Sequence, residues 1–513
     1  MQRGPAERPA WPGARLGALL VAAGVLALHL ALATRYGYFR DELYYIVAGR
    51  HPALGYFDFP LGIAMLTALI GHTLGYGLLA LHLPPALAHA ALVLVAAEIA
   101  GELGGGPFAR LLAALAAAAA PAFLGSASLL TMDIFDELCW GLAAWAAIRA
   151  LRRDDPRQWL WFGAAAAAGL LFKLSILFFG AALLCGLLVS PAGRRQLRSR
   201  WPWLGGALAA AGLLPYLIWE VAHGWPTLAF YAEYRAAQAG NGQGAAVFLE
   251  QQLLLASLFS LPLWGAGLWS SLFGAEGRPL RAIGVAYLLL FVVFAAGHAK
   301  VYFLTPLYPV LFGIGAPRVE AWARGWRGWT RLAYPLVVVA GGGVLAPLVM
   351  PLLPPAAAAA YATPLHAGEY TPTGDNPIIQ PMADRFGWPQ QVAAVAGVWR
   401  ALPAAARAQG CILAGNYGEA AAVDFFGPAL GLPQAISGDN QFFLWGDRGC
   451  SFAVVVSVGL PLPFLQQLFA SVTPQGASNC QYCVPQENGA ALAVAGEPRQ
   501  PPAATWAALR SVG

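Results

Sequence analysis

Charged residues are scarce in this sequence. They make up only 11% of its 513 residues, whereas a soluble domain usually carries about 25%. Hydrophobic residues make up 58%, and the mean hydropathy is +0.59. Apolar runs long enough to cross a bilayer recur as far as residue 354. The composition therefore excludes an ordinary soluble enzyme and predicts a polytopic α-helical membrane protein.

Motifs that bind nucleotides or nucleic acids are also missing. The glycines of the C-terminal part form neither a GxGxxG nor a Walker pattern. The net charge of +5 is small, and no basic tail is present. We therefore expect no nucleotide cofactor and no nucleic-acid partner.

Cysteines are few, and most of them lie in the polar C-terminal part. Four of the six cluster there: Cys411, Cys450, Cys480 and Cys483. Such a cluster suits an oxidising compartment. The Cys480-x-x-Cys483 motif lacks a second CxxC or a His pair, so it predicts a disulfide rather than a metal site. The bridge either joins these two cysteines or joins one of them to Cys411 or Cys450.

About eleven apolar segments are expected to span the membrane. The first follows three N-terminal arginines and ends at Ala33, and we interpret it as an uncleaved helix because it is longer than a signal-peptide core. The others are expected near residues 85–104, 108–127, 134–151, 157–172, 174–190, 203–220, 247–273, 279–297, 303–317 and 331–353. Segment 60–82 is broken by glycines, which predicts a helix lying at the membrane interface.

Basic residues indicate the orientation of this membrane part. With the N-terminus inside, most arginines fall on inner connectors, in clusters over 149–157, 194–200, 278–281 and 318–331. The outer connectors before the C-terminal part hold far fewer basic residues: Arg35, Arg40, Arg50, Lys173, Arg235 and Lys300. The positive-inside rule then places the outer loop 35–84 and the C-terminal part outside.

Residues 355–513 are expected to form a small extracytoplasmic α/β domain, separate from a transmembrane catalytic domain over 1–354. The segment CILAGNYGEAAAVDFFG predicts a strand, a turn and a helix. Further along, FAVVVSVGL predicts a strand, PFLQQLFASV a helix and AALAVAG a strand. Alternation of this kind is typical of an α/β layer.

Acidic and aromatic residues gather in the first outer loop, residues 34–60. It holds Asp41, Glu42, Tyr56 and Asp58. Carboxylates at the end of a membrane segment are costly, which indicates a function. Other outer connectors add the remaining candidates: Asp133, Asp136, Lys173, His223, Arg235, His298, Lys300 and Tyr302. In the expected topology all of them lie at one membrane surface.

These residue types suit sugar transfer from a lipid phosphate. The acceptor hydroxyl loses a proton as it attacks the anomeric carbon, so a carboxylate base is needed. We assign the catalytic group to Asp41, Glu42 and Asp133, with Asp41 as the base. Lys173, Arg235 or Lys300 would bind the departing phosphate, and aromatic residues such as Tyr56 would stack on sugars.

Structural roles stay open beside these functional ones. Asp41 would cap a helix beginning at Leu43, and Asp133 would cap the fourth span. Lys173 would be a snorkelling lysine, and His223 and His298 would be interface residues. Because Glu42 and Asp58 lie in the same loop, a functional role is favoured over a capping role for Asp41. For Asp133 the capping and functional roles are equally well supported.

The chain resembles the GT-C superfamily of polyprenyl-phosphate-sugar glycosyltransferases, and within it glycosyltransferase family 39. That family includes protein O-mannosyltransferases and lipid A aminoarabinose transferases. The resemblance covers nearly the whole chain and rests on FRDELYYIVAG, GYFDFP, TMDIFD, the FKLS turn at Lys173 and AKVYFLTPLYPVLFGIGA. It implies an inverting transfer from an undecaprenyl- or dolichyl-phosphate monosaccharide to an extracytoplasmic lipid, glycan or protein hydroxyl.

The resemblance also implies roles for single residues. Asp41 takes the catalytic carboxylate position of the family, and Asp133 takes the acidic position of the second loop. The aminoarabinose transferases have a Lys where this chain has Phe59, which argues against an aminoarabinose donor. Some relatives bind a divalent metal ion near the site, for which this sequence shows no convincing ligand set.

The expected location is the bacterial inner (plasma) membrane, with many spans and an extracytoplasmic C-terminal domain. The alternative function is a multi-spanning transporter or lipid flippase. Transporters usually place their charged sites near the bilayer midplane, whereas the polar groups of this chain collect at one face. A third possibility is a glycan-binding protein with a degenerate membrane part, against which the retained Asp41, Glu42 and Asp58 argue.

Overall fold

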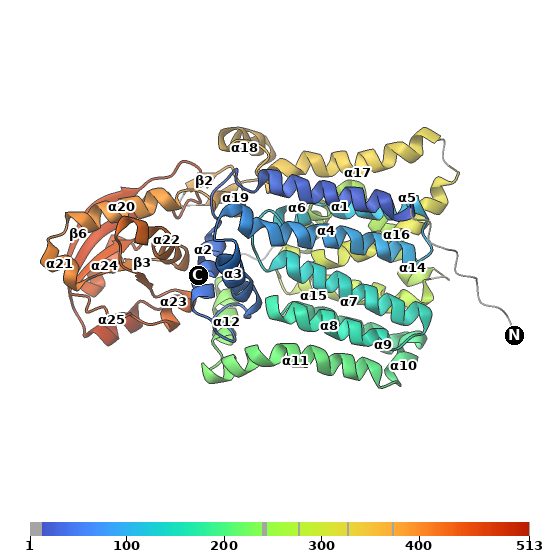
Figure 1. The fold of residues 1–513 in the computed structure, drawn as a ribbon, viewed down its shortest axis with the longest axis horizontal. Helices are drawn as coiled ribbons and strands as arrows, with labels where there is room; N and C mark the ends of the chain where they lie inside the picture. The colour runs from blue at the N-terminus through green and yellow to red at the C-terminus, as the bar shows by residue number, and fades with distance from the viewer. Residues whose placement is uncertain (1–12, 239–243, 275–276, 326–327, 372–373, 512–513) are drawn as a thin grey trace.

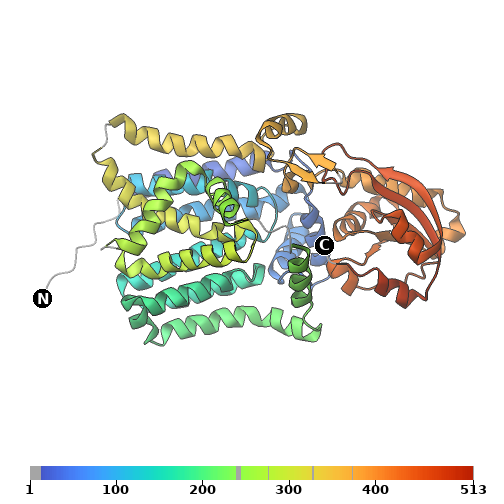
Figure 2. The same cartoon turned by 180° about the vertical axis from the view of Figure 1, so that it is seen from behind.

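The computed structural model describes residues 13–238, 244–274, 277–325, 328–371 and 374–511. A helical bundle forms one end of the molecule and a small α/β domain forms the other (Figure 1). Three helices, α2, α3 and α12, lie between these two parts, as the opposite view also shows (Figure 2). The first loop meets the α/β domain at one end of the bundle, and α10 lies at the opposite end.

The bundle and its connecting helices are built from the following elements. They are α1 (Gly13–Leu32), α2 (Arg40–Arg50), α3 (Gly62–Thr73), α4 (Leu78–Glu102), α5 (Pro107–Ala119), α6 (Pro121–Ser126), α7 (Asp133–Arg153), α8 (Gln158–Phe172), α9 (Ile176–Val189), α10 (Pro191–Leu197), α11 (Trp201–Ala222), α12 (Pro226–Gln238), α13 (Ala245–Leu255), η1 (Leu258–Ser260), α14 (Leu261–Phe273), η2 (Arg278–Leu280), α15 (Arg281–Ala296), η3 (Val301–Leu307), α16 (Tyr308–Ala323) and α17 (Gly328–Val349).

Five helices among the described residues are long and apolar enough to cross a membrane. They are α1 from Arg15, α4, α11, η2 together with α15, and α17. The number rises to seven if each of two bent pairs is one span, namely α9 with α10 and α13 with η1 and α14. The polytopic α-helical fold class is therefore confirmed, whereas the figure of eleven spans stays a prediction.

Prolines decide where several apolar segments break. The expected span over 108–127 divides into α5 and α6 at Ala120, and the span over 174–190 is followed by a bend of 111° into α10. Ala120 and Ser190 both precede a proline and both have extended backbone. Proline disfavours helical backbone in the residue before it, which explains both breaks.

The expectation of one interfacial segment over 60–82 is wrong in its extent. The structure has a short helix, α3, and then a longer helix, α4, which begins at Leu78 and continues into the bundle. The turn between them contains Gly75 at φ +77. Glycine reaches this left-handed conformation at little cost, so the chain reverses there.

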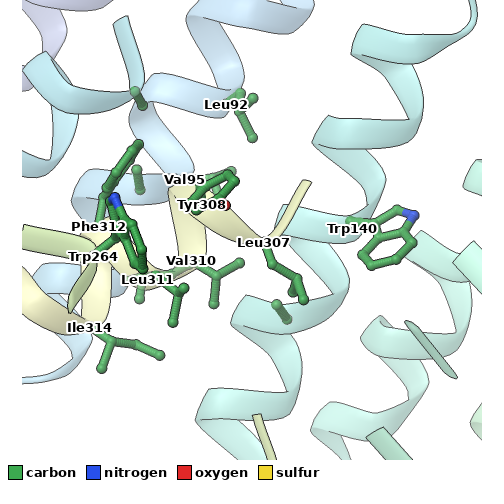
Figure 3. Close-up of a cluster of buried hydrophobic side chains, with 14 of the residues drawn as sticks. Leu92, Val95, Trp140, Trp264, Leu307, Tyr308, Val310, Leu311, Phe312 and Ile314 are labelled. Carbon is green, nitrogen blue, oxygen red and sulfur yellow. The ribbon is translucent and has the colours of Figure 1, made fainter. Parts of the chain in front are cut away.

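Large apolar side chains fill the bundle where α4, α7, α14 and α16 meet (Figure 3). Leu92, Trp140, Trp264 and Phe312 are members of one buried cluster. Small residues let α14 and α16 approach closely, because a Cβ at Gly315 would lie 1.9 Å from the carbonyl oxygen of Leu263. This close packing holds α16 and the preceding η3 in a fixed place at the end of the bundle.

The α/β domain has a five-stranded sheet of order β4-β3-β5-β7-β6. Strand β3 is parallel to β4 and β5, whereas β7 is antiparallel to β5 and β6. The remaining elements of this part are α18 (Pro355–Ala362), η4 (Thr363–Leu365), β1 (Glu369–Thr371), β2 (Gly374–Asn376), α19 (Gln380–Ala383), α20 (Trp388–Ala401), α21 (Ala404–Gln409), β3 (Gly410–Ala414), α22 (Tyr417–Phe426), η5 (Gly427–Leu430), β4 (Ala435–Ser437), α23 (Asn440–Leu444), β5 (Val454–Val458), α24 (Leu462–Leu468), β6 (Phe469–Ser478), β7 (Ala490–Pro498) and α25 (Pro502–Ala508).

The predicted elements of this domain are largely confirmed. The strand, turn and helix expected over 411–427 are β3 and α22, and the two later strands are β5 and β7. The helix expected over PFLQQLFASV ends at Leu468, and its last residues begin β6 instead. Phe469 is fully buried against the apolar cluster of the sheet, which explains why strand pairing replaces the helix there.

One hydrophobic cluster includes residues from both sides of the expected domain boundary at residue 355. One buried cluster contains Leu43 and Ile46 of α2 together with Trp388, Val392 and Ala420 of the α/β domain. The division into 1–354 and 355–513 stays a prediction. The shared core nevertheless holds the first loop and the α/β domain against each other, which matters for the site.

Candidate functional site

Asp41 lies at the junction between the first loop and the α/β domain. Helix α2 begins at Arg40, so Asp41 stands in its first turn, where the helix dipole favours a negative charge. Its Oδ1 accepts a hydrogen bond from the hydroxyl of Tyr417 at 2.8 Å and lies 3.6 Å from Nε of Arg40. Among the described residues nothing donates to Oδ2. The interpretation of Asp41 as a cap is wrong, because Phe39 occupies the N-cap position.

Asp133 and Lys173 form an ion pair where α7 begins and α8 ends. Asp133 is the first residue of α7, and Lys173 follows the last residue of α8. The cap position before α7 belongs to Met132, so the capping interpretation of Asp133 is wrong too. The ammonium group of Lys173 also lies 4.8 Å from the ring centroid of Tyr302, and that of Lys300 lies 6.0 Å from it. Two cations therefore flank one aromatic ring.

Asp58 forms the third acidic position of this region. Its Oδ1 accepts a hydrogen bond of 3.0 Å from the hydroxyl of Tyr44. Burial raises the pKa of Asp58 to about 7, and the nearby carboxylates of Asp41 and Asp439 add to this, while the hydrogen bond from Tyr44 opposes it. Asp58 therefore titrates near neutral pH.

The buried ring of Tyr45 joins these three acidic positions. Burial raises the pKa of its hydroxyl, and the negative charges of Asp41, Asp58 and Asp133 raise it further. Each of the three carboxylates therefore lies near enough to Tyr45 to interact with its hydroxyl electrostatically. The structure thus places Asp41 and Asp58 of the first loop and Asp133 of α7 around one tyrosine.

Several predicted site residues are instead buried and fully engaged in holding the region together. Glu42 is completely buried, and it accepts hydrogen bonds from Nε2 of His82 at 2.8 Å, from the amide of Leu130 at 2.8 Å and from the amide of Phe39 at 2.9 Å. An acid with this environment fixes α2 to α4 and cannot reach an acceptor. The assignment of Glu42 to the catalytic group is therefore dropped.

Tyr56 and Asp136 are also buried and hydrogen-bonded, as Glu42 is. The hydroxyl of Tyr56 is buried and donates to the carbonyl oxygen of Ala48 at 3.0 Å. Asp136 is buried and accepts from the indole of Trp140 at 3.1 Å and from the hydroxyl of Ser175. Both side chains support the residues around the site, so we expect neither to contact a substrate directly.

The remaining candidates lie in different places. His223 is exposed at the end of α11, where its Nδ1 contacts the carbonyl oxygen of Trp219 and its ring stacks on the indole of that residue. These contacts are local ones with Trp219, and the interface role of His223 stays a prediction. His298 is exposed at φ +50 before η3, next to the Lys300 segment. The side chain of Arg235 lies outside the part of the chain that the structure describes.

The cysteines pair differently from the expectation. A disulfide joins Cys411 and Cys450 across 39 residues, and the thiols of Cys480 and Cys483 are free. The expected pairings, which all involved Cys480 or Cys483, are therefore wrong. Cys411 is in β3 and Cys450 lies just before β5, the neighbouring strand, so sheet pairing sets the two close together.

The described part of the chain shows no cluster of side chains able to hold a divalent metal ion. Over residues 13–511, apart from the short gaps in the description, no three His, Cys, Asp or Glu side chains converge as ligands. Asp133 is paired with Lys173, which makes its carboxylate less available to a metal ion.

Comparison with known proteins gives a match to one family. The family described as dolichyl-phosphate-mannose-protein mannosyltransferase matches residues 58–219. This segment contains Asp58, Asp133 and Lys173 but not Asp41. No curated protein sequence matches the chain.

Solved structures give a likeness over almost the full length. ArnT from Cupriavidus metallidurans bound to undecaprenyl phosphate has a TM-score of 0.60 at 15% identity, covering 93% of this chain and 97% of ArnT. The apo state of ArnT gives 0.57 at 16% identity with the same coverage. At this level of identity the likeness shows the fold, so the chain folds like ArnT. The resemblance seen in the sequence is thereby confirmed.

Sequence reasoning missed several residues around Asp41. Arg40, Asp384, Tyr417 and Gln441 all belong to the junction. Arg40 lies 3.5 Å from Asp384, and Gln441 accepts from the amide of Phe57 at 2.8 Å. The only local signal was the Asn416–Glu419 spacing of a capping box before α22, which marks a helix start but not its partner.

Proposed function

We propose that this chain transfers a monosaccharide from a polyprenyl-phosphate sugar to an extracytoplasmic hydroxyl. The observation that carries the proposal is the meeting of Asp41 with the Asp133–Lys173 pair at one end of the bundle. An acidic group beside a pair of lysines suits a reaction in which a hydroxyl loses a proton and a phosphate departs. The fold shared with a protein that binds undecaprenyl phosphate supports the same donor class.

The Asp41 carboxylate and the two lysines would act together in a single displacement. Oδ2 of Asp41 accepts the proton of the acceptor hydroxyl while the hydroxyl oxygen forms a bond to the anomeric carbon. The bond from that carbon to the phosphate oxygen breaks, and the electron pair leaves with the polyprenyl phosphate. Lys173 and Lys300 stabilise the phosphate that departs. A single displacement of this kind inverts the anomeric configuration.

The location of the site also belongs to this proposal. The arginine-rich helix α10 and the α/β domain lie at opposite ends of the bundle (Figure 1). By the positive-inside rule this arrangement supports an outer location for the α/β domain and Asp41, which we assign to a bacterial inner membrane. A transporter is the weaker candidate, because the described polar groups of the site lie where helices begin or end rather than along their middles.

The test is transfer by the purified protein. It is incubated with a panel of radiolabelled polyprenyl-phosphate sugars and membrane extract, and product formation is compared with that of Asp41→Asn. Loss of a positioned base typically lowers the rate about 10²–10⁴-fold. Asp447→Asn, in a loop of the α/β domain, serves as the control and keeps full activity. Near-normal turnover of Asp41→Asn combined with an inactive Asp133→Asn would move the base to Asp133.

A further inference from the structure

The α/β domain presents a defined edge of its sheet to the first loop. Strands β3 and β4 are parallel and end at Ala414 and Ser437. The segments that follow them carry Tyr417 and Gln441, and both residues contact α2. The carboxyl edge of parallel strands is where α/β sheets usually bind ligands. In this protein, that edge contacts the loop that carries Asp41.

Tyr417 makes three different contacts across this junction. Its hydroxyl donates to Oδ1 of Asp41 at 2.8 Å. Its ring centroid lies 4.7 Å from that of Tyr44 and 5.2 Å from the guanidinium carbon of Arg40. The ring is thus held by an aromatic neighbour and a cation, while its hydroxyl is directed at the proposed base.

The backbone around Tyr417 is fixed from the side of the α/β domain. Asn416 and Glu419 form a reciprocal capping box at the start of α22, and the amide of Tyr417 donates to Oδ2 of Asp439 at 3.0 Å. Gly418 has no room for a side chain, because a Cβ there would lie 2.5 Å from Cγ of Arg40. The helix start therefore fits closely against the residue that precedes Asp41.

On the basis of the proposed function, we propose that Tyr417 is a positioning residue for the Asp41 carboxylate, so that the α/β domain completes the catalytic centre. A hydrogen bond to Oδ1 fixes the rotation of the carboxylate and directs Oδ2 toward the acceptor hydroxyl. Orientation of a reacting group within a fraction of an ångström strongly affects the rate. Lys173 and Lys300 come from the bundle, so phosphate binding is independent of Tyr417.

The decisive variant is Tyr417→Phe, which keeps the ring and its contacts and removes only the hydroxyl. The free energy of a hydrogen bond to a charged group corresponds to a change in rate of about ten- to a hundredfold. We expect kcat to fall by that factor, with an unchanged KM for the polyprenyl-phosphate sugar and an unchanged melting temperature. The control is Tyr482→Phe, since Tyr482 packs on Phe386 away from Asp41, and it keeps the wild-type kcat.

A second variant tests the same contact without altering Tyr417. Gly418→Ala places a methyl group against Arg40 and pushes the two surfaces apart, so kcat should fall in the same way. Wild-type kcat in Tyr417→Phe, or a loss that appears equally in KM and in thermal stability, would overturn the inference while leaving the proposed function intact. A wild-type protein that transfers no sugar from any donor would overturn the proposed function, and this inference with it.

Discussion

Lys173 is the residue on which the proposed donor site depends most. It pairs with Asp133 and lies over the rings of Tyr302 and Phe303. Its charge is thus held in place before any phosphate arrives, which lowers the entropy lost on binding. The snorkelling interpretation does not account for these contacts, because a snorkelling lysine extends its ammonium group into water.

Replacing Lys173 by Ala should weaken binding of a polyprenyl phosphate about ten- to a hundredfold, the value of a hydrogen bond to a charged group. Lys173→Arg should retain most of the affinity, since the charge stays. Binding is measured with undecaprenyl phosphate in detergent. Arg499→Ala, which alters a cation of the α/β domain that contacts Gln466, is the control. Equal affinity of Lys173→Ala and wild type would remove Lys173 from the donor site.

Asp58 should make the stability of the protein depend on pH. Its pKa is about 7 in the folded protein and about 3.9 in an unfolded chain. A raised pKa contributes stability that is present below about pH 4 and is lost as the pH rises through 7. Asp58→Asn removes this loss, so the melting temperature of the variant relative to wild type should rise from pH 5 to pH 8.

The control for this experiment is Asp155→Asn. Asp155 is exposed, and its pKa is lowered by the hydrogen bond from Gln158, so it stays ionised across the range. Its variant should follow the wild-type curve in parallel. A constant difference between Asp58→Asn and wild type over pH 5–8 would show that Asp58 has an ordinary pKa.

At the scale of elements, helix α2 depends on one buried acid. Glu42 ties the start of α2 to His82 in α4 and to Leu130 before α7. These contacts fix the orientation of α2 and with it the direction in which the side chain of Asp41 points. The Asp-Glu pair of the sequence thus divides into a residue that faces the site and a residue that holds the helix in place.

Glu42→Gln should destabilise the protein, because an amide NH₂ replaces one of two accepting oxygens and leaves a buried donor without a partner. Such a loss corresponds to about 1–3 kcal/mol. The comparison is Glu102→Gln, which breaks the pair with the exposed Arg153 and should change stability by at most about 1 kcal/mol. Thermal unfolding in detergent measures both. Wild-type stability together with lost transfer in Glu42→Gln would return Glu42 to the catalytic group.

At the scale of the whole molecule, two parts with different origins in the chain share one core. Leu43 and Tyr45 of the first loop pack in the same cluster as Trp388 and Val456 of the α/β domain. The position of the domain relative to the bundle is therefore set by apolar burial, and the hydrogen bonds of Tyr417 and Gln441 specify the register. This arrangement requires both parts to lie on the same side of the membrane.

Cysteine labelling tests that orientation. Leu54→Cys in the first loop and Ala404→Cys at the start of α21 are both exposed positions. A membrane-impermeant maleimide should label them in cells with a permeable outer envelope and an intact inner membrane, relative to the unmodified chain. Asp155→Cys, between α7 and α8, should react only after the inner membrane is opened. Labelling in the reverse order would invert the topology and contradict the proposed location.

Features that depend on a local pattern of residues could be predicted from the amino-acid order. Apolar runs gave the membrane class, arginine clusters gave the expected orientation, and the strand and helix order after residue 410 followed from hydrophobic periodicity. The position of Asp41 just beyond the first apolar run was visible for the same reason. Each of these features needs only neighbours within about one element.

Tertiary structure decided the features that depend on distant neighbours. The hydroxyl that contacts Asp41 comes from a residue 376 positions away, and the pairing of Cys411 with Cys450 follows from the adjacency of β3 and β5. Glu42 and Asp41 are adjacent in sequence, yet Glu42 is buried against His82 and Leu130, whereas Asp41 stays partly open. Burial and long-range pairing arise from how elements pack, and no local pattern of residues encodes that.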